Sequence, residues 1–122
     1  MKNQKTVCCL YRTEHMLSAD RLEMERQRRA CLQYAEKRSW TVLREFWARE
    51  DHMDDPENMD DPLMELCAGA KRRKFDLLLV SKFDRLGRIP GECSFAAAFF
   101  ERRGVEVWEV ADGHIGAYVR KW

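Results

Sequence analysis

Short apolar runs alternate with longer amphipathic stretches along this chain, which is the pattern of strands and helices in turn. The most continuous run covers residues 77–80; it is too short for a buried helix and is bounded by charged residues. Such a run is typical of a strand buried on both faces of a parallel sheet. Residues 6–11 have the same character, and residues 41–47 and 105–110 predict two further strands.

Three stretches with apolar residues at three- and four-residue spacing predict helices over residues 18–38, 62–70 and 92–103. Ser18 or Asp20 can cap the first helix, and Pro62 suits the first turn of the second. Pro90 and Gly91 interrupt the chain before the third helix, and Gly104 ends it. The order β-α-β-α-β-α-β follows. It predicts an α/β fold in three layers, an open, mostly parallel sheet of about four to five strands with helices on both faces.

Polar residues follow two of the predicted strands at the points where those strands end. Arg12 comes directly after the first strand, and Asp84, Arg85 and Arg88 follow the strand at residues 77–80. The carboxyl ends of parallel strands meet at one edge of the sheet, where open α/β sheets bind ligands. Arginines three residues apart face the same side of a helical turn, and converging guanidinium groups suit a phosphate. A solvated turn with a surface ion pair would account for the same residues.

Side chains alternate along a strand, and this places the residues after the first strand on two faces. Arg12 and Glu14 are expected to point one way and Thr13 the other. Asp84 could hold one arginine in place or receive a proton. Ser18 lies farther along and could approach only from a loop.

The length, net charge and cysteine content of the chain limit the kinds of protein that it can be. The chain has 122 residues and a formal net charge of +1, which predicts one domain with no bulk attraction to DNA or membrane. No signal peptide and no apolar stretch long enough for a bilayer is recognised, so a cytoplasmic protein is expected. The five scattered cysteines are expected to be reduced and to fill the core. No zinc site or cofactor is expected, because the histidines show no ligand spacing with the cysteines.

Residues 50–61 interrupt this regular pattern. They hold seven acidic residues and are followed by Pro62, and a loop of this length is unusual in a small domain. The ligand spacing of an EF-hand is missing, so a solvated connector is expected here in preference to a calcium site. The basic run at residues 71–74 could touch a nucleic-acid backbone, or could simply end a helix.

Taken together, these motifs resemble the catalytic domain of the serine site-specific recombinases, the resolvase/invertase group. That family has a first strand ending Tyr-x-Arg-x-Ser, a helix that contains a glutamine, and Asp-Arg-Leu-x-Arg after the third strand. The chain has Arg12, Gln27 and the segment Asp84-Arg85-Leu86-Gly87-Arg88. Gln27-Arg28-Arg29-Ala30, Tyr34-Ala35 and Gly104-Val105-Glu106-Val107 also follow the family's rhythm, so that the resemblance covers nearly the whole chain.

The resemblance implies a DNA strand-exchange chemistry that needs no metal. In the family a serine hydroxyl attacks a DNA phosphodiester, forms a phosphoserine and releases a 3′ hydroxyl. Arg12, Arg85 and Arg88 match the arginines that bind the phosphate, and Gln27 and Asp84 match positions that orient the site. Charge that develops on the phosphate would be stabilised by these arginines.

The chain departs from the family pattern at the nucleophile. Glu14 stands at the serine position, and Leu10 stands where the motif has tyrosine. A carboxylate would repel the phosphate there, which leaves Thr13 and Ser18 as weak substitutes. Asp61 replaces the arginine that the family places before the proline of its short helix, among other acids that oppose DNA.

These observations support three hypotheses. The first is a recombinase-type catalytic domain with impaired cleavage, over residues 1–122, without the DNA-binding domain that follows in active relatives. The second is a non-catalytic module that forms a homodimer or associates with an intact recombinase and binds DNA only weakly. The third is a small α/β protein that holds a phosphorylated ligand between Arg12, Arg85 and Arg88.

Overall fold

The computed structural model describes residues 5–13, 18–49, 62–87 and 89–115. The predicted acidic loop at residues 50–61, Glu14 and Arg88 lie outside the described residues. The elements, in chain order, are β1 (Thr6–Thr13), α1 (Ser18–Lys37), β2 (Thr41–Arg49), α2 (Pro62–Lys71), β3 (Leu77–Val80), η2 (Phe83–Arg85), α3 (Pro90–Arg102), β4 (Glu106–Glu109) and β5 (Gly113–His114).

The strands form one five-stranded sheet in the order β2-β1-β3-β4-β5. The pairs β2–β1, β1–β3 and β3–β4 are parallel, and β5 is antiparallel to β4. The predicted α/β fold with a mostly parallel sheet is therefore confirmed. β1 and β3 occupy the middle of the sheet, where a strand is covered on both faces, and this explains their continuous apolar runs.

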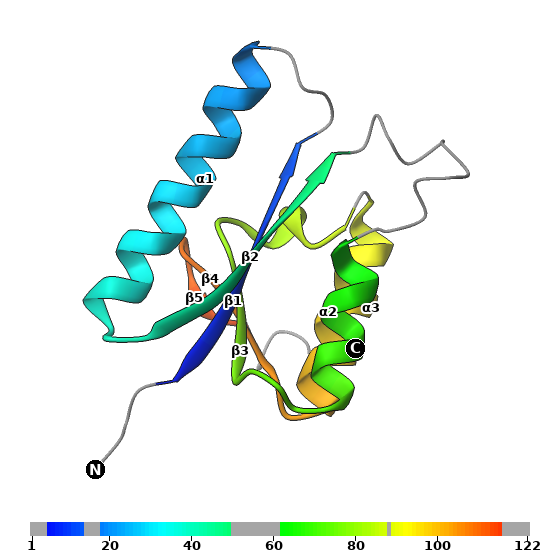
Figure 1. Cartoon of the computed structure of the whole chain (residues 1–122). Helices are drawn as coiled ribbons and strands as arrows, with labels where there is room; N and C mark the ends of the chain where they lie inside the picture. The colour runs from blue at the N-terminus through cyan, green and yellow to red at the C-terminus, as the bar shows by residue number, and fades with distance from the viewer. Residues whose placement is uncertain (1–4, 14–17, 50–61, 88, 116–122) are drawn as a thin grey trace.

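Helix α1 covers one face of the sheet, and α2 and α3 cover the other (Figure 1). Alternate residues of β1 and β3 pack on opposite faces of the sheet, because successive side chains of a strand point to opposite faces. On the α1 side the core contains Val7, Cys9, Tyr11, Met24, Cys31, Ala35, Leu77 and Leu79. On the other side Cys8, Leu10, Leu78 and Val80 pack with residues that include Leu66, Ala97 and Phe100.

The cysteines are core residues, as the sequence predicts. None of the five forms a disulfide, and all except the half-buried Cys67 are buried. Burial raises the pKa of the Cys8 thiol to about 11. A thiol with that pKa is protonated at neutral pH and behaves as a small apolar side chain.

All three α-helices end in the same way before the strand that follows. At the end of α2, the N–H of Lys74 donates to the carbonyl of Gly69 and the N–H of Arg73 donates to the carbonyl of Ala70. This pair of bonds is a Schellman motif, which needs a left-handed residue after the helix. Ser39, Arg73 and Gly104 take that conformation after α1, α2 and α3, with φ of 59°, 53° and 83°.

Three boundaries differ from the sequence prediction. β1 continues past Tyr11 through Arg12 and Thr13, because these residues pair with Ala48 and Arg49 of a β2 that is itself longer than expected. Pro90 does not interrupt the chain but begins α3, where a missing N–H costs nothing. The prediction also omitted β5, since a two-residue strand has no periodic signal.

Candidate phosphate-binding site at the carboxyl edge of the sheet

Arg12 lies near the end of β1, and only 3% of its surface is exposed. Its Nε donates a hydrogen bond to the carbonyl of Arg85 at 3.1 Å, and its Nη2 donates to the carbonyl of Leu86 at 3.4 Å. The guanidinium group therefore joins β1 to the segment that follows β3. The two clusters that the sequence analysis placed at one edge of the sheet do lie together.

Gln27 of α1 fixes the main chain of Arg12. Its Oε1 accepts a hydrogen bond from the Arg12 N–H at 3.0 Å, and its Nε2 donates to the Arg12 carbonyl at 2.9 Å. Gln27 is 2% exposed, so its amide would have no water to replace these partners. β3 pairs with β1 only at residues 7–9, so Arg12 lies beyond that ladder. The side chain of Gln27 thus provides the main chain of Arg12 with hydrogen-bond partners, as β3 does for earlier residues of β1.

Arg85 belongs to the short 3₁₀ turn η2, and its side chain is directed toward α1. Its Nη2 lies 3.3 Å from Oε1 of Glu23, and its Nε lies 3.6 Å from Oδ1 of Asp84. Arg85 Nε is buried and has no hydrogen-bond acceptor among the described residues. Asp84 is largely exposed, and among the described residues its carboxylate forms only this long contact with the neighbouring Arg85.

The segment after η2 is pressed against the beginning of α3. A Cβ atom at Gly87 would lie 2.6 Å from Cβ of Glu92 and 3.2 Å from the backbone nitrogen of Cys93. The Cys93 thiol donates a long hydrogen bond of 3.7 Å to the Gly87 carbonyl, and burial raises the pKa of that thiol. Leu86 is fully buried beside it. A glycine is therefore needed here for close packing, and this packing holds the carbonyls that Arg12 contacts.

Of the residues proposed from the sequence, the structure gathers Arg12, Gln27, Asp84 and Arg85. Thr13 is buried next to Arg12, and Ser18 begins α1. Glu23 was missed by the sequence analysis. Its signal was its position four residues before Gln27, which places both on one face of α1.

Arg12 and Arg85 do not line either of two cavities found in the described part of the molecule. One, of about 460 Å³, lies between α1 and β2 and is lined by residues that include Arg28, Trp40 and Val42. The other, of about 390 Å³, is lined by Phe83, Glu109, Asp112, His114 and Ile115. Its carboxylates make it unsuitable for a phosphate. The candidate site is accordingly a set of arginines engaged with protein atoms, and an anion would have to compete with Glu23 for Arg85.

Neither a candidate membrane-spanning helix nor a cluster of metal-binding side chains is found among the described residues. No helix among them has the length and apolar character that a membrane crossing requires. They contain no group of three or more histidine, cysteine, aspartate or glutamate side chains placed to bind a metal ion.

Comparison with known families and structures supports the resemblance. The family model described as "Resolvase, N terminal domain" matches residues 13–119. The N-terminal catalytic domain of TP901-1 integrase shares 18% identity with this chain, at a TM-score of 0.73 over 96% of this chain and 90% of that one. No curated protein matches the sequence.

Two further solved structures have the same fold. The C-terminal catalytic domain of ISC1926 TnpA, an IS607-like serine recombinase, gives a TM-score of 0.69 at 21% identity, over 86% of this chain and 70% of that one. A resolvase family site-specific recombinase from Streptococcus pneumoniae gives 0.70 at 15% identity, over 90% and 74%.

Proposed function

Because the chain belongs to the Resolvase, N terminal domain family, we propose that it is a serine-recombinase catalytic domain whose DNA cleavage is impaired or absent. The observation that carries this proposal is that Glu14 stands two residues after Arg12, the position that the resemblance assigns to the family's serine. Transesterification requires an oxygen that bonds to phosphorus while the bond from phosphorus to the 3′ oxygen breaks. A glutamate there adds negative charge beside a phosphate and provides no hydroxyl for a phosphoserine.

The neighbouring hydroxyl groups are poor substitutes. Thr13 is 4% exposed, and as the next residue of β1 it lies on the opposite face of the strand from Arg12. Ser18 is the first residue of α1. Neither position supports an attack on a phosphate held by Arg12.

The arginines support the retention of an anion site. Arg12, Arg85 and Arg88 would bind the phosphate, while Gln27 and Asp84 would position Arg12 and Arg85. The hydrogen bonds from Gln27 to the Arg12 main chain and the ion pair of Arg85 with Glu23 are consistent with a site that is held closed. We infer that the negative charge of Glu14 further disfavours an anion at this site.

A domain of this kind would act through association. Members of the family generally bind DNA and dimerise, and we propose that this chain forms a homodimer or associates with an intact recombinase. Its own affinity for DNA would be weak, because the chain has Asp61 among other acidic residues where the resemblance implies an arginine. The alternative, a site for a small phosphorylated ligand, rests on the same arginines and predicts stabilisation by that ligand without any DNA.

The test is a covalent-adduct assay with nicked duplex DNA, with the unmodified chain, Glu14→Ser and the double variant Glu14→Ser/Arg12→Met. We expect no adduct from the unmodified chain and an adduct from Glu14→Ser that is lost in the double variant. An adduct from the unmodified chain, mapped to Thr13 or Ser18, would overturn the proposal. Absence of an adduct from both the unmodified chain and Glu14→Ser would favour the non-catalytic association module. Measurements of the molecular mass in solution, with and without an intact recombinase, then test that association.

A further inference from the structure

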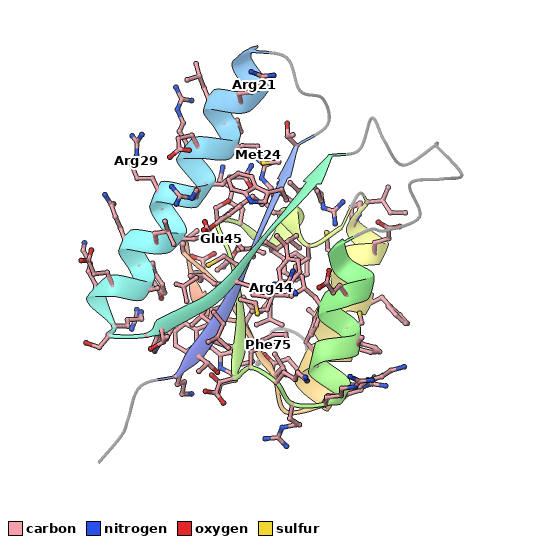
Figure 2. The ribbon with its side chains drawn as sticks, in the orientation of Figure 1. Arg21, Met24, Arg29, Arg44, Glu45 and Phe75 are labelled. Carbon is pink, nitrogen blue, oxygen red and sulfur yellow. The ribbon has the colours of Figure 1, made fainter. Side chains whose placement is uncertain are left out.

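Five exposed cations gather at the edge of the sheet opposite the candidate site. Lys71, Arg72, Arg73 and Lys74 form the end of α2 and the turn into β3, and Arg102 is the last residue of α3. We call these five residues the basic surface. In Figure 2, nitrogen-tipped side chains project from the lower end of α2 and α3, away from the carboxyl ends of β1 and β2.

The two turns that carry the basic surface are in direct contact. A Cβ atom built at Gly104, just beyond α3, would lie 3.0 Å from Cζ and 3.1 Å from Nη1 of Arg73. The Arg73 guanidinium group therefore lies against the backbone of Gly104. This contact joins the turn after α2 to the turn after α3, and Arg102 lies two residues before Gly104 in the chain.

The charges of the basic surface are not neutralised by the described acidic residues. No ion pair joins any of the five to a described carboxylate, although several acids share this edge. Those acids have other partners: Asp76 accepts from Thr6, Glu106 pairs with Lys5, and Glu101 contacts His114 and the N–H of Val107. Five exposed cations without an ion-pair partner among the described residues create a local attraction for a polyanion.

Arg73 is placed at a conformational cost. Its φ of 53° is the left-handed value that Gly104 takes without strain in the equivalent position after α3. A residue with a side chain adopts this conformation less readily than glycine does. A favourable interaction with the helix dipole does not explain an arginine at position 73. Such an interaction is limited to the last turn of a helix, and Arg73 lies beyond the end of α2. The arginine is thus unfavourable for the turn, and its side chain contributes charge to the basic surface.

We propose that the basic surface binds the phosphate backbone of duplex DNA, on the side of the domain opposite the candidate site. Lysine and arginine side chains bind the phosphates of a duplex through charge, and such contacts need no particular base sequence. The exposed cations carry no large exposed apolar side chain between them that would anchor an acidic protein. This inference goes beyond the proposed function, since it holds whether or not the domain cleaves DNA.

Fluorescence anisotropy with a labelled duplex of about 30 base pairs tests the proposal. Five phosphate contacts predict that log K falls with log salt with a slope of about −4.5. The variant Lys71→Gln/Lys74→Gln/Arg102→Gln should reduce the slope to about −2. The matched control is Arg21→Gln/Arg26→Gln/Arg29→Gln, which removes the same charge from exposed positions of α1 and should retain the slope.

Arg73→Gly separates binding from folding. It relieves the left-handed strain, so its Tm should be unchanged or higher while the salt slope decreases in magnitude by about 0.9. The proposal is overturned if the duplex does not bind at low salt, or if the first triple variant and its control lose affinity equally. Displacement of the duplex by polyglutamate at equal charge concentration would also overturn it, in favour of an acidic protein partner.

Discussion

Glu23 of α1 forms an ion pair with Arg85, with 3.3 Å between Oε1 and Nη2. The two residues are 62 positions apart in the chain, and their contact ties the segment after β3 to the helix that covers β1. Arg85 is one of the arginines proposed to bind phosphate. Its guanidinium group is therefore held by a carboxylate in the structure, and the affinity of the site for an anion depends on how readily that pair opens.

Glu23→Gln should increase the affinity of the protein for sulfate on the order of tenfold, because an anion would no longer compete with a carboxylate for Arg85. Both partners are partly exposed, so the free energy of unfolding without sulfate should change by less than about 1 kcal/mol. Thermal denaturation in increasing sulfate measures the affinity through linkage. Glu25→Gln, which removes one of the two acidic partners of Arg28 and leaves its pair with Glu45, is the control. Equal sulfate affinity in the two variants would show that Glu23 does not restrain the site.

Gln27→Met should lower the free energy of unfolding by about 3 kcal/mol. The substitution leaves the N–H and the carbonyl of Arg12 without their partner in a buried position, and each such group costs about 1–3 kcal/mol. Urea denaturation measures the loss. Gln33→Met, at an exposed position of the same helix, should change stability by less than about 0.5 kcal/mol. A loss at Gln27 no larger than at Gln33 would contradict the positioning role assigned to its amide.

Gly87→Ala should destabilise the protein by about 1–3 kcal/mol, since its Cβ would overlap Cβ of Glu92 at the start of α3. The same change should weaken sulfate binding, because the segment that Arg12 contacts would have to move. Gly91→Ala is the matched control: nothing lies within 4 Å of its Cβ position, and alanine favours the helix by about 0.5–1 kcal/mol. Equal stability of the two variants in chemical denaturation would argue against close packing at Gly87.

Glu109 should make the protein less stable as the pH rises above 4.5. Burial raises the pKa of Glu109; the hydrogen bond from the Phe83 N–H, at 2.5 Å, lowers it, and Asp112 raises it, with a net increase from 4.5. In the window between the unfolded pKa and the raised folded pKa, the folded state binds more protons than the unfolded state. The stabilisation contributed by protonated Glu109 is therefore fully present below the unfolded pKa, and it is lost as the pH rises through the folded pKa.

The measurement is the Tm of Glu109→Gln between pH 4 and pH 7. Glutamine retains the acceptor for Phe83 without the charge, so the variant should be more stable than the unmodified chain at pH 7 and should lose that advantage near pH 4. Glu25→Gln removes the same charge from an exposed position and should not reproduce this pH dependence. A constant difference in Tm across the range would rule out titration of Glu109 as its cause.

The class of fold, the three α-helices and the four parallel strands could all be predicted from the sequence alone. These features have local causes: continuous apolar runs at residues 77–80 and within β1 require burial on both faces, and Pro62 and Gly104 mark helix ends through their own backbone geometry. The sequence also placed Arg12 and Arg85 at one edge of the sheet, because the carboxyl ends of parallel strands coincide. The positions of these two arginines in the fold could thus be predicted without coordinates.

The groups that these arginines contact could not be predicted from the sequence and depend on the folded chain. That Arg12 donates to the carbonyls of Arg85 and Leu86, and that Arg85 pairs with Glu23, depends on distances between segments far apart in the chain. The extension of β1 through Thr13 likewise depends on pairing with β2, and β5 exists only because β4 offers it an edge. Local sequence sets the conformation of a segment, but partners for its side chains and its backbone come from the packing of the whole chain.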